Sequence, residues 1–183
     1  MFSRVKMIAT GVAAVALTAM AAIAPAEAAS RDKSFFDGVQ GQWTGPGEIV
    51  AGKYKGTKFT CDLKGESKRN GAGLILDGSC RVGVFAQPMS ATIERNGESY
   101  KGSFLDGSEG KGLDIVSGAV VGNRVIVGIN RKNLNGAMIA RLKDKNTLNV
   151  TISVRVNDSL VPVIGMTLDR KMDQAAVGSI KQD

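Results

Sequence analysis

The sequence predicts an all-β protein, an up-and-down antiparallel β-barrel of eight to ten strands. Three observations predict it. Apolar and polar residues alternate with a period of two over most of the chain beyond residue 57. Dipeptides typical of tight turns separate the alternating runs, and glycine, with 23 of 183 residues, suits turns and bent strands. A β-sandwich is the alternative, but a closed barrel leaves no exposed strand edge.

The first 28 residues have the pattern of a secretory signal peptide. Arg4 and Lys6 precede an apolar stretch, and Ala26-Glu27-Ala28 fits a cleavage site. We expect cleavage near Ala28, with Ala26 as the alternative position, and therefore a periplasmic or secreted protein. The predicted organisation is a signal peptide at 1–28, a single β-barrel domain at 29–171 and a C-terminal tail at 172–183. No later stretch is apolar and long enough to span a bilayer.

The segment after the signal peptide leads into the first strand. Phe35 and Phe36 predict a short helical turn against the mouth of the barrel, and a loosely held arm is the alternative. The first strand is expected around Gly41-Gln42-Trp43-Thr44-Gly45-Pro46-Gly47, with Trp43, the only tryptophan, filling one end of the barrel.

The next two runs predict a hairpin that carries a disulfide. Alternation through Phe59, Cys61 and Leu63 resumes at Leu74 and continues through Cys80, and Asn70-Gly71 lies between the runs. With Asn70-Gly71 as the two-residue loop, Cys61 faces Cys80, within disulfide range. The only two cysteines of an exported chain should therefore be oxidised. Redox or metal chemistry is the alternative, but the sequence has no CxxC spacing and no histidine.

A second Asn-Gly pair, Asn96-Gly97, predicts the next hairpin. As a two-residue loop it would pair Ile93 with Tyr100, Ala91 with Gly102 and Met89 with Phe104, all on one face. Two strands are expected at Leu113–Val121 and Arg124–Asn130, around a turn at Gly122-Asn123. The glycine-rich stretch 106–112 between these regions lacks the lysine and helix of a phosphate-binding loop, so we read it as a connecting loop.

The last two hairpins follow the same logic. A loop at Asp144-Lys145-Asn146, with Asn146 in the left-handed conformation, would pair Leu142 with Leu148, Ala140 with Val150 and Met138 with Ile152. A final strand is expected after Asn157-Asp158-Ser159, with Pro162 at an edge or bulge. Its predicted inner face is Leu160, Pro162, Ile164, Met166, Leu168 and Arg170. The tail beyond it is expected to be a short helical turn or frayed.

Gly41-Gln42-Trp43 resembles the G-x-W motif on the first strand of the calycins, the lipocalin-like barrels. The resemblance implies that an arginine of the final strand, here Arg170, packs over Trp43 and closes that end; the alternative is that Arg170 ends the strand in solvent. The wider pattern of signal peptide, W-x-G-x-G start, two cysteines and hairpins looks like small exported α-proteobacterial proteins of unassigned function. It is also similar to the secreted bacterial metalloprotease inhibitors. The later lipocalin motifs are not recognisable.

The composition argues against an enzyme. Without histidine, the Ser-His, Cys-His and His-metal arrangements are impossible, and both cysteines are assigned to a disulfide. A carboxylate site from Asp106, Glu109 and Asp114 is conceivable, but solvated loop residues are the better interpretation. We expect no cofactor and no metal.

Two kinds of binding protein remain. The first is an envelope protein that acts through its surface or loops, as an inhibitor, stabiliser or interaction module. Its partner would be another envelope protein or, given the net charge of +7, an anionic envelope polymer. The second is a carrier of a small apolar ligand in the barrel. Its candidate lining residues are Met89, Ala91, Ile93, Tyr100, Gly102, Phe104, Met138, Ala140 and Met166. Export, scattered charge and few aromatics make nucleic acid an unexpected partner.

Overall fold

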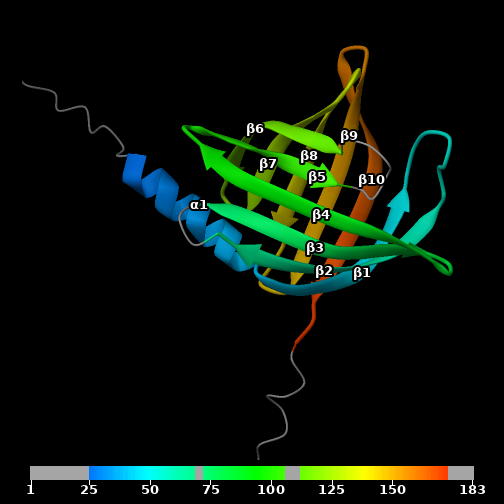
Figure 1. Ribbon diagram of the computed structural model, residues 1–183, viewed down its shortest axis with the longest axis horizontal. Helices are drawn as coiled ribbons and strands as arrows, with labels where there is room; N and C mark the ends of the chain where they lie inside the picture. The colour runs from blue at the N-terminus through cyan, green and yellow to red at the C-terminus, as the bar shows by residue number, and fades with distance from the viewer. Residues whose placement is uncertain (1–24, 69–71, 106–111, 173–183) are drawn as a thin grey trace, which may run out of the picture.

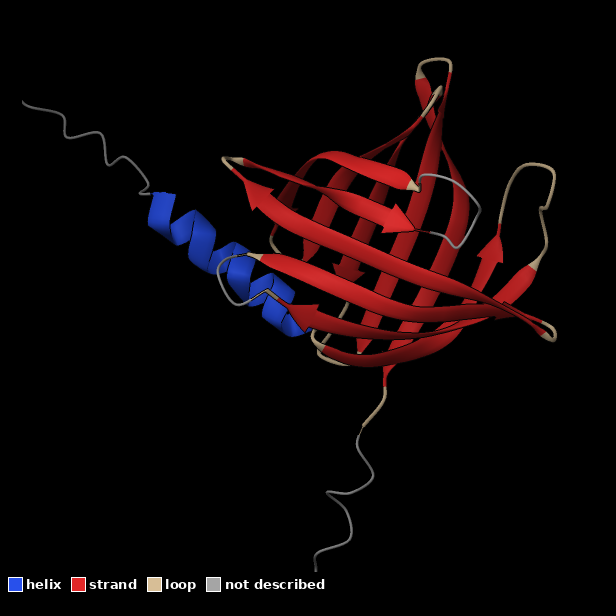
Figure 2. Cartoon of the chain, in the orientation of Figure 1, coloured by secondary structure: helices blue, strands red, loops and turns tan. Residues whose placement is uncertain are grey.

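One helix precedes ten antiparallel strands, and each strand pairs with the next along the chain (Figure 1, Figure 2). The structure, a computed structural model, describes residues 25–68, 72–105 and 112–172. The elements are α1 (Pro25–Val39), β1 (Gly41–Ile49), β2 (Lys58–Ser67), β3 (Gly73–Val82), β4 (Phe85–Asn96), β5 (Ser99–Leu105), β6 (Leu113–Val121), β7 (Arg124–Arg131), β8 (Leu134–Leu142), β9 (Thr147–Val156) and β10 (Ser159–Arg170). Because β10 pairs with β1, the sheet closes, and the predicted up-and-down barrel is confirmed.

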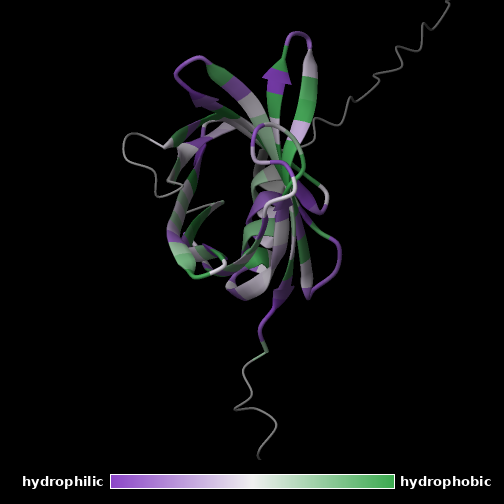
Figure 3. Cartoon of the chain, turned by 90° about the vertical axis from the view of Figure 1, so that its right-hand side faces the viewer, coloured by the Kyte–Doolittle hydropathy of each residue, from purple (hydrophilic) through white to green (hydrophobic). Residues whose placement is uncertain are grey.

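The two ends of the barrel differ. At the closed end, where β1 begins and β10 ends, α1 lies against the strands (Figure 1). The opposite end carries the β1–β2, β3–β4, β7–β8 and β9–β10 connections, and we call residues 50–58, 81–85, 131–134 and 155–160 the open rim. Figure 3 views the barrel from the side that lies at the right of Figure 1, and hairpins project at its upper edge. The strands thus present two separate sets of loops.

The helix is longer than the predicted helical turn. The described part of it runs from Pro25 to Val39 and so includes the expected cleavage site. Phe35, Phe36 and Val39 are buried in the core of the barrel, so the loosely held arm is wrong for this segment. Lys33 and Asp37 form an ion pair one turn apart, at 2.7 Å, on the outer face.

The register of the β2–β3 hairpin is confirmed. Cys61 lies opposite Cys80 and the two form a disulfide, with Cα atoms 4.0 Å apart. The Asn70-Gly71 turn itself lies outside the described residues. The pairing from Thr60↔Arg81 to Ser67↔Leu74 follows the expected register throughout.

The register of the β4–β5 hairpin differs from the prediction by two residues. The loop is Gly97-Glu98 rather than Asn96-Gly97, so Ile93 faces Gly102 and Ala91 faces Phe104. Only Gly97 has a positive φ, +63°, as a turn with glycine in its first loop position requires. A shift of two keeps every side chain on its predicted face, because sides alternate with a period of two.

The remaining turns are partly as expected. Gly122-Asn123 joins β6 and β7, and the β8–β9 register, Leu142↔Leu148 to Gly136↔Val154, is confirmed. Asn146 is not left-handed: its backbone N–H instead donates to the Asp144 carboxylate at 2.8 Å, which stabilises the loop locally.

A bulge interrupts β10. The register against β9 shifts between Pro162 and Ile164, at the position where proline cannot donate to the ladder. As a result the predicted continuous inner face is wrong at its start: Leu160 and Pro162 are exposed, whereas Leu168 is buried.

The disulfide leads to a stability prediction. Replacing Cys80 with serine removes the crosslink between β2 and β3 and should lower the free energy of unfolding by roughly 2–5 kcal/mol. Urea denaturation followed by Trp43 fluorescence measures it. Reduced wild type should show a comparable loss; unchanged midpoints in both would contradict a stabilising role for the bridge.

Candidate functional site

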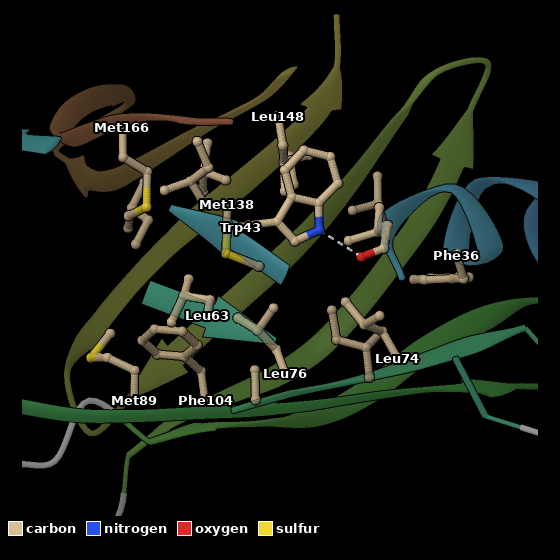
Figure 4. Close-up of a pocket in the computed structure, with 18 of the residues that line it drawn as sticks. Phe36, Trp43, Leu63, Leu74, Leu76, Met89, Phe104, Met138, Leu148 and Met166 are labelled. Atoms are coloured by element: carbon tan, nitrogen blue, oxygen red, sulfur yellow. Dashed lines mark hydrogen bonds between the residues drawn. The ribbon is translucent and has the colours of Figure 1, made fainter. Parts of the chain in front are cut away.

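The closed end is organised around Trp43. Its side chain is fully buried, and its indole N–H donates to the carbonyl oxygen of Val39 at 2.8 Å (Figure 4). Val39 is the last residue of α1, so this bond ties the helix to the first strand. An indole whose donor is satisfied can be buried without the cost of an unpaired polar group.

Arg170 completes this end. It is the direct neighbour of Trp43 across the β1–β10 pair, and its guanidinium carbon lies 4.2 Å from the indole ring centroid. The guanidinium also donates to the carbonyls of Gly38 at 2.6 Å, of Lys145 at 2.9 Å, and of Gln40. The carbonyls of the last turn of a helix lack partners within the helix, and a cation there opposes the helix dipole favourably. Arg170 therefore joins α1, β1, β10 and the β8–β9 loop.

Tyr100 holds the other side of the helix. Its hydroxyl donates to the Asp32 carboxylate at 2.6 Å, and Arg95 donates to the same oxygen at 3.2 Å. The ring packs 5.5 Å from that of Phe36. Burial, together with the hydrogen bond to Asp32, raises the pKa of the Tyr100 hydroxyl. Arg95 and Tyr100 reach one carboxylate because the observed β4–β5 register places them opposite each other.

The barrel interior is mostly filled. A cavity of about 70 Å³ remains, and only apolar side chains line it, from the strands and from α1 (Figure 4). The predicted lining residues that reach it are Met89, Ala91, Ile93, Phe104, Met138, Ala140 and Met166. Tyr100 and Gly102 do not. The register shift moves Tyr100 to the level of the helix, and Gly102 packs so closely that a Cβ would lie 1.8 Å from the Thr92 carbonyl oxygen. Ligand pockets usually measure about 300–1,000 Å³, so this cavity is small.

Most of the exposed large apolar side chains in the described residues lie on the open rim. Eleven large hydrophobic side chains are exposed in the described part of the chain. Eight of them lie on the rim: Val50, Tyr54, Val82, Val84, Phe85, Leu134, Val156 and Leu160. The other three, Val116, Val121 and Met172, lie elsewhere. Exposed apolar groups that gather on one face mark an interaction site more often than single ones do.

This rim was not predicted from the sequence. The available signal was Gly83-Val84-Phe85, where valine and phenylalanine follow the glycine of the β3–β4 turn. Tight turns usually carry glycine, asparagine, aspartate or serine, so the turn conformation does not account for an apolar pair at this tip. Of the carboxylates that we considered for catalysis, Asp114 is exposed on β6, and Asp106 and Glu109 lie outside the described residues. Within residues 25–68, 72–105 and 112–172, no cluster of acids or cysteines has the arrangement of a metal site.

Comparisons with known proteins support the fold. No protein-family model and no curated protein matches the sequence. The chain is similar in structure to Rv2717c from M. tuberculosis, with 14% identity and a TM-score of 0.57 over 77% of this chain and 98% of that one. It is also similar to a protein of unknown function from the DUF3598 family of Nostoc punctiforme, with 14% identity and a TM-score of 0.48 over 74% of this chain and 49% of that one. The first of these likenesses concerns the fold alone.

The contacts of Arg170 make its replacement costly. Arg170→Met keeps an apolar stem over Trp43 but loses three hydrogen bonds and the cation–π contact, so unfolding free energy should fall by about 2–4 kcal/mol. Arg170→Lys should recover only part of it, because an ammonium cannot reproduce the guanidinium fork. Urea denaturation followed by Trp43 emission measures both, and a fully stable methionine variant would contradict this role.

The buried Tyr100 hydroxyl predicts a loss of stability at alkaline pH. A raised pKa in the folded state means that the neutral phenol is favoured there. The free energy of unfolding should therefore fall as pH rises above about 10, the ordinary tyrosine pKa. Tyr100→Phe should reduce this dependence, which paired denaturation curves at neutral and alkaline pH would measure. An identical alkaline loss in both proteins would be the contrary result.

Proposed function

We propose that the protein is a non-enzymatic binding protein of the cell envelope that acts through the loops of its open rim. The observation that carries the proposal is the gathering of exposed apolar side chains there, led by Val84 at 89% and Phe85 at 79% exposure. These side chains contribute nothing to the core, and exposing them favours association and aggregation.

The chemistry of the chain supports a binding role over catalysis. The sequence has no histidine, and both cysteines are in the disulfide. The disulfide is compatible with an oxidising, exported location, as the predicted signal peptide requires. None of the helices in the described residues is long and apolar enough to cross a membrane. The closed end, by contrast, has its polar groups engaged in holding α1, and so offers little to a partner.

Carriage of a small apolar ligand is the second candidate. The wholly apolar lining favours it, as do Met89, Met138 and Met166, because methionine side chains repack readily. The cavity of about 70 Å³ would have to enlarge several-fold to hold a ligand of ordinary size. Native mass spectrometry of protein from its own host separates the two candidates, since a carrier retains a bound small molecule.

Site-specific photo-crosslinking tests the rim in its native setting. A photoreactive phenylalanine analogue at position 85 should give adducts in intact host cells, because this side chain is at the proposed contact. The same analogue at Lys101, exposed on the wall of β5, is the matched control and should give few. Equal adduct yields at the two positions, or none at position 85, would overturn the proposal.

A further inference from the structure

The open rim combines apolar tips with positive charge. Tyr54 lies between Lys53 and Lys55 on the β1–β2 loop, and the Lys53 ammonium is 5.5 Å from the Tyr54 ring centroid. At the β3–β4 tip, Arg81 precedes Val84 and Phe85 in the sequence. The exposed cations of the rim are Lys53, Lys55, Lys58, Arg81, Lys132 and Arg155.

Of these cations, only Arg81 acts on the pKa of an acid in the described residues: Lys171 and, to a lesser extent, Arg81 lower the pKa of the Asp62 carboxyl. None of the six forms an ion pair with an acid in residues 25–68, 72–105 or 112–172. The ion pairs there involve the helix, its surroundings and the barrel wall, as with Asp32 and Arg95. The described acids near the rim are Glu48, Asp114 and Asp158. The rim therefore carries an excess of positive charge around its apolar tips.

We infer that the open rim docks on the surface of an anionic phospholipid bilayer. This inference rests on the proposed function, since it names the partner of the same rim. Apolar side chains flanked by lysine and arginine suit the boundary between acyl chains and charged headgroups. Tyrosine is favoured at that depth, because its ring is apolar and its hydroxyl remains hydrated.

The arrangement of the tips favours a bilayer over an acidic protein. Tyr54, Val84-Phe85 and Leu160 stand on three different hairpins, β1–β2, β3–β4 and β9–β10, which project separately in Figure 1. A protein partner would need a matched pocket for each tip. A fluid lipid layer accepts separate tips without shape complementarity. Basic residues on the same loops would then contact lipid phosphates while the tips enter the apolar layer.

Vesicle co-sedimentation of the purified protein tests the inference. One vesicle population is phosphatidylcholine alone, and the other is equal parts phosphatidylcholine and phosphatidylglycerol. Binding to the anionic vesicles should be at least about tenfold tighter and should weaken as salt is raised. Equal binding to both vesicle types, or binding to neither, would overturn the inference.

Paired variants locate the contact. Val84→Ser with Phe85→Ser should weaken binding to the anionic vesicles about tenfold or more, since the apolar tip is lost. The control, Val121→Ser, removes a valine that is 50% exposed where β6 ends, at the closed end, and should leave binding within about twofold. Tyr54→Ser, in an exposed loop, is a second probe that keeps the test valid if the double variant fails to fold.

Charge variants separate local contact from overall net charge. Lys53→Gln with Lys55→Gln should weaken binding about tenfold to thirtyfold at low salt. Lys143→Gln with Lys145→Gln removes the same charge from the β8–β9 loop at the closed end and should change binding little. Equal losses in the two pairs would overturn the assignment to the rim.

The crosslinking and vesicle experiments fail independently. Adducts to protein from position 85, together with no binding to anionic vesicles, would overturn the lipid partner and leave the rim as a binding surface. Absence of adducts from position 85 together with no vesicle binding would remove both proposals. Lipid adducts from position 85, with rim-dependent binding to anionic vesicles, would support both.

Discussion

The guanidinium of Arg170 is where the first strand, the last strand and the helix meet. It lies over the Trp43 indole and donates to carbonyls at the C-terminus of α1 and in the β8–β9 loop. A ten-strand meander closes only if its two terminal strands pair, and β1 and β10 pair with Trp43 directly opposite Arg170. The same contact supplies donors to helix carbonyls that have no partner within the helix. Closure of the sheet and docking of the helix therefore share one side chain, which contacts all three elements.

The closed end and the open rim have opposite chemistry. At the closed end, Trp43, Tyr100 and Arg170 all have polar partners, and the aromatic side chains of α1 fill the space between the strands. At the open rim, large apolar side chains and six cations are exposed to solvent. The interior leaves a cavity of only about 70 Å³ between them. The contacts of Trp43, Tyr100 and Arg170 thus lie at one end of the barrel, and most of the exposed large apolar side chains lie at the other.

Local sequence patterns predicted much of the fold, and each wrong prediction has a local cause. Alternation and turn dipeptides predicted eight to ten strands, against ten in the structure, and they predicted the Cys61–Cys80 pairing. The predicted β4–β5 register is wrong because a loop at Asn96-Gly97 and a loop at Gly97-Glu98 are both compatible with the sequence. In the observed register, Tyr100 lies opposite Arg95, and both contact Asp32 on α1. The bulge after Pro162 was foreseen as a possibility, but its effect on the exposure of Leu160 depends on how β10 pairs with β9.

The sequence by itself determined the fold class, because period-two alternation and hairpin turns are properties of neighbouring residues. It also determined the disulfide partners, since the chain has only two cysteines and their strands are joined by one turn. Tertiary structure alone decided that the interior is nearly full and that Tyr100 holds the helix rather than lining the cavity. It also decided that apolar residues from four separate loops gather on one rim. These features depend on which strands pair to close the barrel and on how side chains from distant segments pack in its interior. Neither can be read from a local sequence pattern.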